Sequence, residues 1–561
     1  MKASFERAIA NVIRHGDTDI FPFPIENHLF FDKRAEVVAL LQDIHANFEE
    51  SLSKYPPANE GALAPVSYAG FRWATQLDPL WNLYFLSLVL SIAESIEEAR
   101  LPPEINCIFS YRYKWNEMTA DLFDARYHWG AFMECSLRHA KSHKFIVLCD
   151  ISEFYPRLGH HRLENALLHL SVQSDAHKRI MTFLSNFSNA SSFGLPVGGP
   201  AARILSELVL NQIDRLLLTE GVAFCRFADD FHIFCDSTEE AYGSLIFLTE
   251  KLFRNQGLQL QKSKTRIMSS AEFAATSPLR IDDHDAPAAE PKTTVLQEQA
   301  RGLLRLSLRF DPYSATARAD YEALKAELEK FDVLGLLREE LSKSRIHISL
   351  TRKLVNALKY IDRVHQDDAI ISLINNAELL YPIFPAVLTV VKTVFNDLSS
   401  DTQGLIHRKV VELIENHSHV LLVELNLAYA IRLLSCHHSL EAEAALAKLY
   451  KLPTSSTLLR RDIILAMAKW KNWYWLSDLR ASFRSLSSPS AVPSSWLRTR
   501  CGMRGSIGAN IPLASSVPLS NSCRLGSHRR LIKVVGASRC DFGTGLLPIS
   551  LVILASSSAD N

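Results

Sequence analysis

In the first half of the chain the sequence reads Cys225-Arg226-Phe227-Ala228-Asp229-Asp230-Phe231-His232-Ile233-Phe234. Two short apolar runs flank the Asp-Asp pair, a pattern that predicts a β-hairpin with both acids at its turn. Adjacent carboxylates repel each other, so such a pair persists where a positive charge offsets the repulsion, and a divalent metal ion is the usual candidate. Taken alone, the pair also fits an ordinary polar turn.

A third acid follows an upstream apolar run, Phe145-Ile146-Val147-Leu148-Cys149-Asp150, which predicts a buried strand that ends on an aspartate. Three aspartates at neighbouring strand ends can hold two Mg²⁺ ions, for which Mn²⁺ can substitute. One ion would activate an attacking 3′-hydroxyl, and the other would neutralise a triphosphate and its leaving pyrophosphate. Asp150, Asp229 and Asp230 are therefore the candidate metal ligands and catalytic residues.

Two further segments bracket the Asp pair. The run Gly194-Leu195-Pro196-Val197-Gly198-Gly199-Pro200 leads into a helical pattern, and its glycines let the backbone approach a base pair and template closely, which makes Gly198 a candidate nucleotide contact. Downstream, Gly257-Leu258-Gln259-Leu260-Gln261-Lys262-Ser263-Lys264-Thr265 offers Lys264 as a donor to departing pyrophosphate. Common Gly-Pro turns and a solvated basic loop are the alternative interpretations.

In this order the four segments resemble the palm motifs of reverse transcriptases, and the resemblance runs from Ile105 to Met268. It implies an α+β fold, a right-hand polymerase with fingers and palm, in which the three aspartates bind metal. Tyr155 matches the steric-gate position, where a large ring beneath the sugar excludes a 2′-hydroxyl and selects dNTPs. A core tyrosine at a strand-to-helix turn is the alternative.

Upstream, Ser110-Tyr111-Arg112-Tyr113-Lys114 lies where the fingers of this family present cations to the incoming triphosphate. The resemblance implies Arg112 first and Lys114 second as ligands of the dNTP. An ordinary surface cation is the alternative for either residue.

The glycine turn continues as Gly199-Pro200-Ala201-Ala202-Arg203-Ile204-Leu205-Ser206-Glu207. This G-P-x-x-R-I-x-x-E form is similar to the abortive-infection and other defence-associated reverse transcriptases of bacteria, which carry a large helical domain after the palm. The resemblance implies a role in antiphage defence and DNA synthesis on an RNA template or without one. Its partners would be dNTPs, RNA and nascent single-stranded DNA. Priming from a protein hydroxyl is also implied, for which the helical region offers Tyr313, Tyr321, Tyr360, Tyr381, Tyr429, Tyr450 and Tyr474.

Two other functions compete with this one. A retroelement or group II intron-type reverse transcriptase is disfavoured because no maturase segment or HNH-like Cys/His endonuclease set is recognised. A non-catalytic nucleic-acid-binding scaffold with a relict palm is disfavoured because all three aspartates are intact.

Periodicity divides the chain into five parts. We expect an N-terminal helical extension (1–104) with one long buried helix from Leu80 to Arg100, fingers and palm (105–275), and a Pro/Ala/Asp-rich linker (276–293). Residues 294–486 contain almost only helix-period sequence, which indicates an all-α bundle or HEAT-like solenoid.

Residues 487–561 differ in composition, with seven Arg and one Lys against only two acids, Asp541 and Asp560. The segment reads either as a disordered basic tail or as an out-of-frame translation of DNA that once encoded more helical domain.

The whole chain has 61 basic and 61 acidic residues, and zero net charge is compatible with a local basic channel for nucleic acid. None of the nine cysteines forms a CxxC pair, so neither a zinc ribbon nor a disulfide framework is predicted. The N-terminus lacks an apolar signal core, and the longest late apolar run is too short to span a bilayer. We expect a cytoplasmic bacterial protein without a membrane partner, for which an oligomer is compatible.

Overall fold

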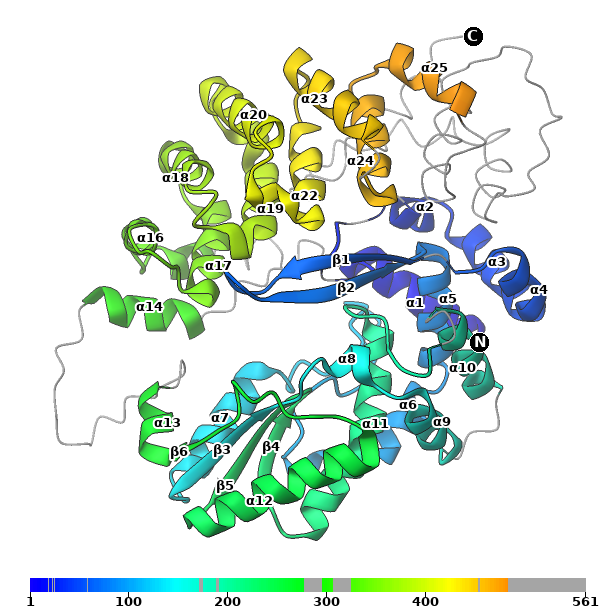
Figure 1. Ribbon diagram of the computed structural model, residues 1–561, viewed down its shortest axis with the longest axis vertical. Coiled ribbons are helices and arrows are strands. Elements are labelled where there is room, and N and C mark those ends of the chain that lie inside the picture. The colour runs from blue at the N-terminus through cyan, green and yellow to red at the C-terminus, as the bar shows by residue number, and fades with distance from the viewer. Residues whose placement is uncertain are drawn as a thin grey trace. The chain divides into compact units, whose positions relative to one another are not determined.

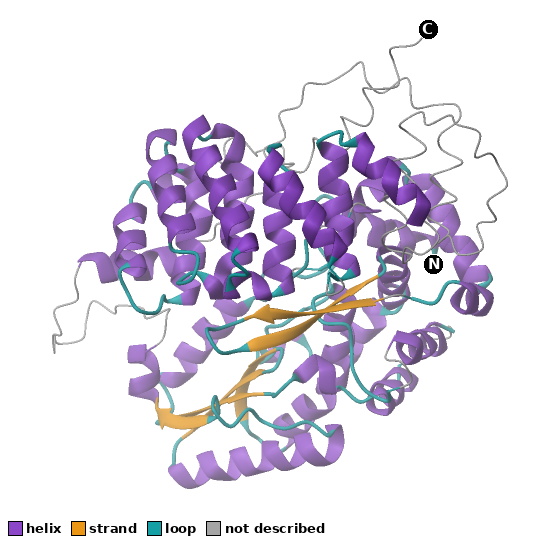
Figure 2. Cartoon of the chain, turned by 45° about the horizontal axis from the view of Figure 1, so that its top comes forward, coloured by secondary structure: helices purple, strands orange, loops and turns teal. Residues whose placement is uncertain are grey.

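The computed structural model describes residues 1–482, except 19, 23, 25, 58, 171–174, 188–190, 277–294, 306–323 and 453–454. The chain divides into two compact units, of which the first comprises Met1–Asn59 and Ala74–Pro291 and the second comprises Glu60–Trp73 and Lys292–Asn561. The predicted linker beyond Thr276 and the predicted tail 487–561 lie outside the described residues (Figures 1 and 2).

The first unit is α+β, with a small sheet among many helices. Its elements are α1 (Lys2–His15), α2 (Glu26–Asp32), α3 (Arg34–Ala46), α4 (Phe48–Lys54), α5 (Pro79–Leu90), α6 (Ala93–Ala99), η1 (Pro103–Ile105), α7 (Trp129–Ala140), β3 (Phe145–Asp150), α8 (Phe154–Arg157), α9 (His160–Leu168), α10 (Ala176–Phe187), α11 (Pro200–Thr219), β4 (Ala223–Phe227), β5 (Asp230–Cys235), α12 (Thr238–Lys251), η2 (Leu252–Gln256), β6 (Arg266–Ser269) and α13 (Ser270–Thr276).

The sheet has the strand order β4-β5-β3-β6, and its neighbouring strands are all antiparallel. The predicted hairpin is confirmed: β4 and β5 pair with Phe227 opposite Asp230, and Ala228 and Asp229 form the turn. The predicted strand that ends on Asp150 is confirmed as β3. Because β3 lies beside β5, both predicted acid-bearing segments reach the same edge of the sheet, by which we mean the same end of its two central strands.

Helices cover both faces of this sheet, as strand alternation shows. Cys225 of β4 contacts Cys135 of α7, whereas the next residue, Arg226, bonds to Asp214 of α11. Since successive strand side chains point to opposite faces, α7 and α11 lie on opposite sides of the sheet. The face toward α7 carries an apolar cluster that includes Phe132, Ile146, Phe234 and Met268.

The expectation of one long helix from Leu80 to Arg100 was wrong. The structure has two helices, α5 and α6, bent by 48° at the break. The hydroxyl of Ser91 donates to the Leu88 carbonyl at 2.7 Å, and such a side-chain bond competes with the helical backbone ladder. Every residue of α5 is buried, and Asp78 caps it by accepting from the amides of Leu80 and Trp81.

The described elements of the second unit after residue 294 are all helical. They are α14 (Val295–Arg305), α16 (Val333–Leu341), α17 (Ile348–Ala357), η3 (Leu358–Tyr360), α18 (Arg363–Asn375), η4 (Tyr381–Ile383), α19 (Phe384–Val394), η5 (Phe395–Asp397), α20 (Ser400–Glu415), α21 (His419–Leu422), α22 (Glu424–Leu434), α23 (Leu440–Lys451), α24 (Thr457–Lys469) and α25 (Trp473–Ser482).

Within that unit the helices pack in two rows (Figure 1). One row runs through α17, α19, α22 and α24, each in contact with the next, and the other runs through α18, α20 and α23. The choice between a bundle and a HEAT-like solenoid stays a prediction.

We had expected the N-terminal extension to be helical throughout, but it is not. It contains a two-stranded sheet of β1 (Asn59–Pro65) and β2 (Phe71–Leu77), and residues 60–73 of this hairpin belong to the second unit. Tyr68 in the connecting turn anchors it, because its hydroxyl donates to the Leu379 carbonyl at 2.7 Å and accepts from the Ile346 amide at 3.1 Å.

Within the described part of the chain, no single helix is long and apolar enough to cross a membrane. The bent pair of α5 and α6 meets that test of length and composition when the two helices are taken together.

Candidate active site

Three acids gather at one edge of the sheet. Asp150, the last residue of β3, lies directly opposite Asp230, the first residue of β5, and Asp229 stands next to them in the turn. Backbone bonds fix this edge, since the Ile151 amide donates to the Asp229 carbonyl at 3.1 Å. The Gln261 amide donates to the Asp150 carbonyl at 2.7 Å, so the downstream loop is held against β3 as well.

The electrostatics of this edge call for a cation. Burial, together with the neighbouring carboxylates of Asp229 and Asp150, raises the pKa of Asp230 to about 7 against the opposing effect of Lys264. The ammonium group of Lys264 donates to Asp150 Oδ2 at 2.6 Å. One lysine balances only one of three carboxylates, so the remaining negative charge fits a divalent metal ion.

Lys264 is the predicted cation that the structure brings to the acids. Its side chain is 62% exposed, and although burial opposes the shift, the bond to Asp150 raises its pKa. The charged amine therefore lies at the surface of the site, where it can reach a ligand.

Tyr155 and the glycine turn are joined by their backbones. The Leu195 amide donates to the Tyr155 carbonyl at 2.9 Å, and Gly194 and Gly198 both have positive φ, which glycine adopts at little cost. The Tyr155 hydroxyl is buried without a hydrogen-bond partner among the described residues. Burial raises the pKa of this phenol well above its usual value, and the nearby Asp229 contributes in the same direction.

The two predicted cations of the fingers have different surroundings. Arg112 is buried, its guanidinium pairs with Glu97 at 2.7 Å, and it lies over the Tyr127 ring. As placed, this guanidinium is engaged with the protein's own Glu97, and its binding of a dNTP stays a prediction. Lys114 is 66% exposed and lies 3.6 Å from Asp124, which leaves it accessible.

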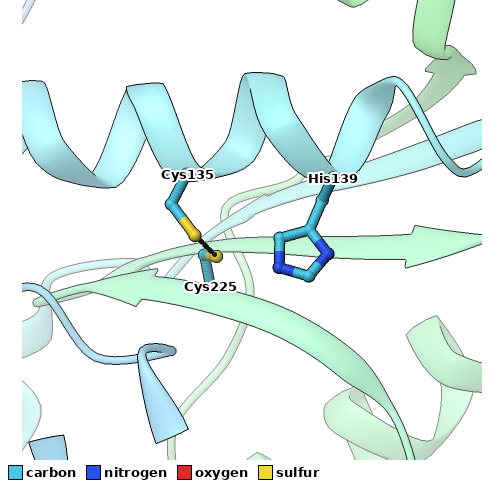
Figure 3. A group of neighbouring side chains, drawn as sticks. All are labelled: Cys135, His139 and Cys225. Carbon is cyan, nitrogen blue, oxygen red and sulfur yellow. Dashed lines mark hydrogen bonds between the residues drawn. The ribbon is translucent and has the colours of Figure 1, made fainter. Parts of the chain in front are cut away.

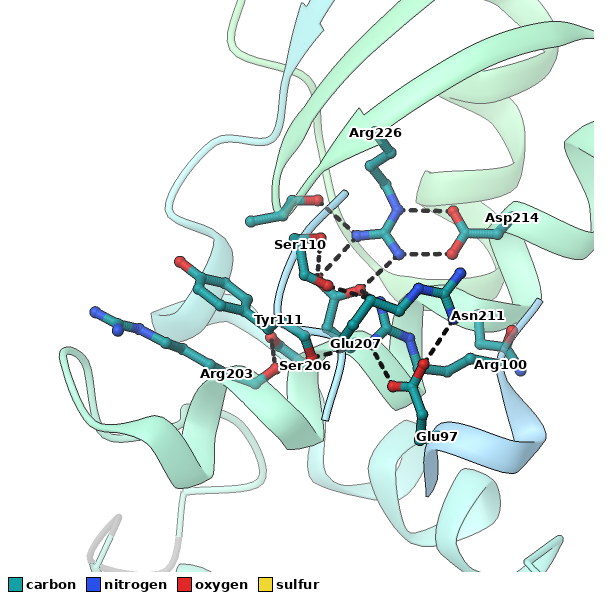
Figure 4. A network of polar contacts seen from close by, with 12 residues as sticks. Glu97, Arg100, Ser110, Tyr111, Arg203, Ser206, Glu207, Asn211, Asp214 and Arg226 are labelled. Atoms are coloured by element: carbon teal, nitrogen blue, oxygen red, sulfur yellow. Dashed lines mark hydrogen bonds and ion pairs between the residues drawn. The ribbon is translucent and has the colours of Figure 1, made fainter. Parts of the chain in front are cut away.

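A buried ionic cluster lies behind the hairpin, on the α11 face of the sheet (Figure 4). Arg226 of β4 is fully buried and forms a two-bonded fork with Asp214, at 2.7 and 2.6 Å. It also bonds both carboxylate oxygens of Glu207, at 3.1 and 2.9 Å. The same guanidinium donates to the Ala228 carbonyl at 2.9 Å.

That last bond matters for the acids because Ala228 precedes Asp229. Ala228 has a φ of 51°, a left-handed conformation that costs a non-glycine residue about 1–2 kcal/mol. The bond from Arg226 helps hold this turn, so the buried arginine positions the residues that carry the carboxylates.

The cluster extends from the palm to the predicted fingers. Glu207 accepts from the Ser110 hydroxyl at 2.6 Å and from Arg100 at 2.6 Å, and Arg100 also donates to the Ser110 and Tyr111 carbonyls. With Glu97 and Arg112 the cluster contains three guanidinium groups and three carboxylates, so its formal charge balances. The two buried arginines lower the pKa of Glu207 although burial opposes them.

Sequence reasoning missed this cluster, although it left a signal. Arg226 interrupts an apolar strand and Glu207 interrupts an apolar helix, and charged residues at such positions are seldom buried unless paired.

Sequence reasoning also gave Arg203 no role. The guanidinium of Arg203 lies 5.2 Å from the centre of the Tyr111 ring, and Figure 4 shows it pointing away from the buried cluster. Its positive charge lowers the pKa of Tyr155, against the larger effect of burial.

Comparison with known proteins gives the family of this region. Residues 91–335 match the family described as reverse transcriptase (RNA-dependent DNA polymerase), a span that includes the three acids, Tyr155, the glycine turn and Lys264. No curated protein sequence matches the chain.

Among solved structures, the chain is similar to telomerase from Candida albicans in complex with a TWJ fragment of telomeric RNA. The identity is 12%, over 69% of this chain and 70% of that chain, with a TM-score of 0.29. Apo telomerase from Candida tropicalis shows 10% identity over 74% of this chain and 67% of that chain, also with a TM-score of 0.29. These TM-scores are too low to establish a shared overall fold.

Domains of this family use divalent metal ions, which agrees with the charge of the acid cluster. Residues 91–335 are therefore a reverse transcriptase domain, and the chain is an RNA-directed DNA polymerase, a nucleotidyltransferase.

Proposed function

We propose that the chain extends a DNA strand by two-metal nucleotidyl transfer, with Asp150, Asp229 and Asp230 as the metal ligands. The observation that carries this proposal is the register of β3 and β5, which sets Asp150 opposite Asp230 beside Asp229. Two Mg²⁺ ions, or Mn²⁺ in their place, would activate the 3′-hydroxyl and neutralise the triphosphate.

The chain's own groups would handle the nucleotide around that centre. Lys264 is bonded to Asp150 and exposed, so its amine would be near enough to the acids to donate to the departing pyrophosphate. Lys114, which is exposed, and Arg203, whose charge acts on Tyr155, would bind the triphosphate together with Arg112. Tyr155 would lie beneath the sugar, and Gly198 would let the backbone approach the base pair.

The test is incorporation of labelled dNTPs on a primed RNA template, with Mg²⁺ or Mn²⁺ supplied. Asp229→Asn and Asp150→Asn each remove one charge from the metal cradle, so we expect the rate to fall roughly a thousandfold or more. Glu239→Gln, which changes an acid on α12 away from the sheet edge, is the matched control and should keep the wild-type rate. Wild-type incorporation by Asp229→Asn would remove the site assignment.

We further propose that this activity serves antiphage defence in the bacterial cytoplasm. The support is the G-P-x-x-R-I-x-x-E turn into α11 and the helical unit that follows the palm sequence. Template-independent synthesis primed from a protein hydroxyl belongs to the same proposal.

A phage challenge separates this role from its alternatives. Cells that express the chain should survive infection better than cells that express Asp229→Asn at the same level. Equal protection by both would favour a non-catalytic scaffold. Mobilisation of the coding DNA into new loci, without protection, would favour a retroelement enzyme.

A further inference from the structure

Two cysteines and a histidine meet on the side of the sheet opposite the buried ionic cluster (Figure 3). Cys135 and His139 lie four residues apart on α7 and therefore share one helix face. Cys225 reaches them from β4, and its thiol donates to Cys135 Sγ at 3.5 Å. The two sulfurs and a ring nitrogen of His139 all lie within 4.8 Å of one another.

We propose that Cys135, His139 and Cys225 bind one Zn²⁺ ion that ties α7 to β4. Zinc prefers thiolate and imidazole ligands in tetrahedral geometry. With Zn–S bonds of about 2.3 Å, two sulfurs of one tetrahedron stand about 3.8 Å apart, so the observed 3.5 Å needs only a small adjustment. A disulfide would instead need the sulfurs to approach to about 2.05 Å.

The charge of this ligand set suits its surroundings. Two thiolates, one neutral imidazole and Zn²⁺ sum to zero, and a neutral centre is the form that an apolar interior tolerates. Both cysteines belong to the buried cluster that includes Phe109, Phe132 and Met133. Without a metal both cysteines would stay neutral thiols in that cluster, and a bound Zn²⁺ would offset the charge of the thiolates that form when it binds.

Neighbouring groups hold the ligands in place. The His139 ring stacks on Phe234 of β5, with centroids 4.6 Å apart and planes 16° apart, which orients the imidazole along the sheet. Asn106 Nδ2 lies 3.7 Å from Cys135 Sγ, a weak bond of the kind that supports a metal-bound thiolate. His139 is only half-buried, so a water molecule can take the fourth position from that side.

The site would act on the palm through the chain rather than on the nucleotide. Cys225 precedes the fully buried Arg226 by one residue and the Asp229 turn by four, so the ion would fix β4 on one face while Arg226 fixes it on the other. The zinc is thus structural and separate from the two-metal centre of the proposed function.

Metal analysis of the purified full chain tests the proposal. After dialysis against metal-free buffer, elemental analysis should find one zinc per wild-type chain, and Cys225→Ser and His139→Gln should each lose it. Cys235→Ser, which changes a buried cysteine of β5 outside the trio, should retain one zinc. Zinc-free wild-type protein that also fails to take up added Zn²⁺ would overturn the site, as would retention of zinc by Cys225→Ser.

Cobalt gives a readout that does not depend on the variants folding. Co²⁺ added to zinc-depleted wild-type chain should produce a thiolate-to-cobalt charge-transfer band that Zn²⁺ then abolishes. A wild-type spectrum with no such band contradicts thiolate ligation. Loss of two free thiols without any metal would assign the pair to a disulfide instead.

Discussion

At the scale of single residues, Tyr155 is the position that should select the sugar. Tyr155 lies five residues after Asp150, the last residue of β3. Its hydroxyl is buried without a hydrogen-bond partner among the described residues, so we expect the ring and not the hydroxyl to block a 2′-hydroxyl. Tyr155→Ala should raise incorporation of rNTPs relative to dNTPs by about tenfold or more, since about 1.4 kcal/mol of lost discrimination gives a factor of ten.

Tyr155→Phe is the matched control, because it keeps the ring and removes only the unpartnered hydroxyl. We expect its rNTP/dNTP ratio, measured by single-nucleotide extension with each triphosphate, to equal that of the wild type. An unchanged ratio in Tyr155→Ala would exclude the gate.

Arg226 is the second residue whose replacement gives a test, here of how much the buried ionic cluster stabilises the palm. Arg226→Ala would leave Asp214 buried without the arginine it pairs with, and Glu207 with Arg100 as its remaining ionic partner; breaking a buried ion pair typically costs about 3–5 kcal/mol. We expect a matching loss in the free energy of urea unfolding of the palm, followed by fluorescence. Arg126→Ala, which removes an exposed guanidinium paired with Asp124, should leave that free energy nearly unchanged, because an exposed ion pair contributes little to stability.

A milder variant separates the positioning role of Arg226 from its contribution to stability. Arg226→Lys keeps the charge but cannot reproduce the fork, so the bond to the Ala228 carbonyl should be lost or weakened. We expect kcat to fall in that variant under conditions where it is folded, with little change in KM for dNTP. A kcat equal to that of the wild type would show that the turn does not need this bond.

Residue-level prediction from the sequence succeeded where the signal was local. Asp150, Asp229 and Asp230 each end or begin an apolar run, so their convergence follows from strand pairing. The pairing of Arg112 with Glu97 of α6 was not foreseen, because sequence spacing does not show it. Whether a cation faces solvent or a buried acid depends on tertiary contacts.

At the scale of elements, the hairpin β4–β5 was predictable and the hairpin β1–β2 was not. The first has a sharp polar turn between apolar runs. The second alternates weakly, and its turn is anchored by Tyr68 to carbonyl and amide groups more than 270 residues away. The break between α5 and α6 was hidden for a different reason: α5 itself contains Asn82 and Ser87, so a further serine at Ser91 does not mark a helix end in the sequence.

Helix α20 carries a buried histidine that should make the second unit sensitive to acid. His407 is 4% exposed, neither ring nitrogen has a hydrogen-bond partner among the described residues, and its ring packs on Phe395 and His437. Burial, together with the nearby His437, lowers its pKa to about 4. The fold therefore holds His407 neutral.

The sign of the effect follows from proton linkage. Below the unfolded pKa of about 6.5 the unfolded chain binds a proton that the folded chain does not, so stability falls as the pH drops toward 4. The loss contributed by His407 reaches about 3 kcal/mol at and below pH 4. His407→Leu should flatten the fall of melting temperature between pH 6.5 and 4. His365→Leu, at an exposed position of α18, should leave that fall unchanged, and equal slopes in all three proteins would refute the prediction.

At the scale of the whole molecule, zero net charge conceals a local organisation. Asp150, Asp229 and Asp230 gather at one sheet edge, whereas the carboxylates of the buried arginine cluster are each paired with a guanidinium group. The order of palm segments could be recognised from sequence because each segment is short and contiguous. The division into two units could not, since residues 60–73 join a unit that otherwise begins at Lys292.

The helical unit is also where protein priming can be tested. Among the candidate tyrosines that the structure describes, Tyr474 of α25 is 82% exposed, whereas Tyr381 is 8% exposed and packs edge-on against Phe71. A priming hydroxyl must reach the palm and attack a triphosphate, and a phenol held in a packed interior cannot do so. We therefore expect Tyr474 to carry the first nucleotide.

The wild-type chain, incubated with dNTPs and metal and then denatured, should retain labelled DNA that nuclease removes. Tyr474→Phe should retain none, and Tyr381→Phe should retain as much as the wild type. Label that persists in Tyr474→Phe would move the attachment to another hydroxyl, which peptide mapping of the nuclease-trimmed adduct would locate, and a wild-type chain free of label would exclude priming by this protein altogether.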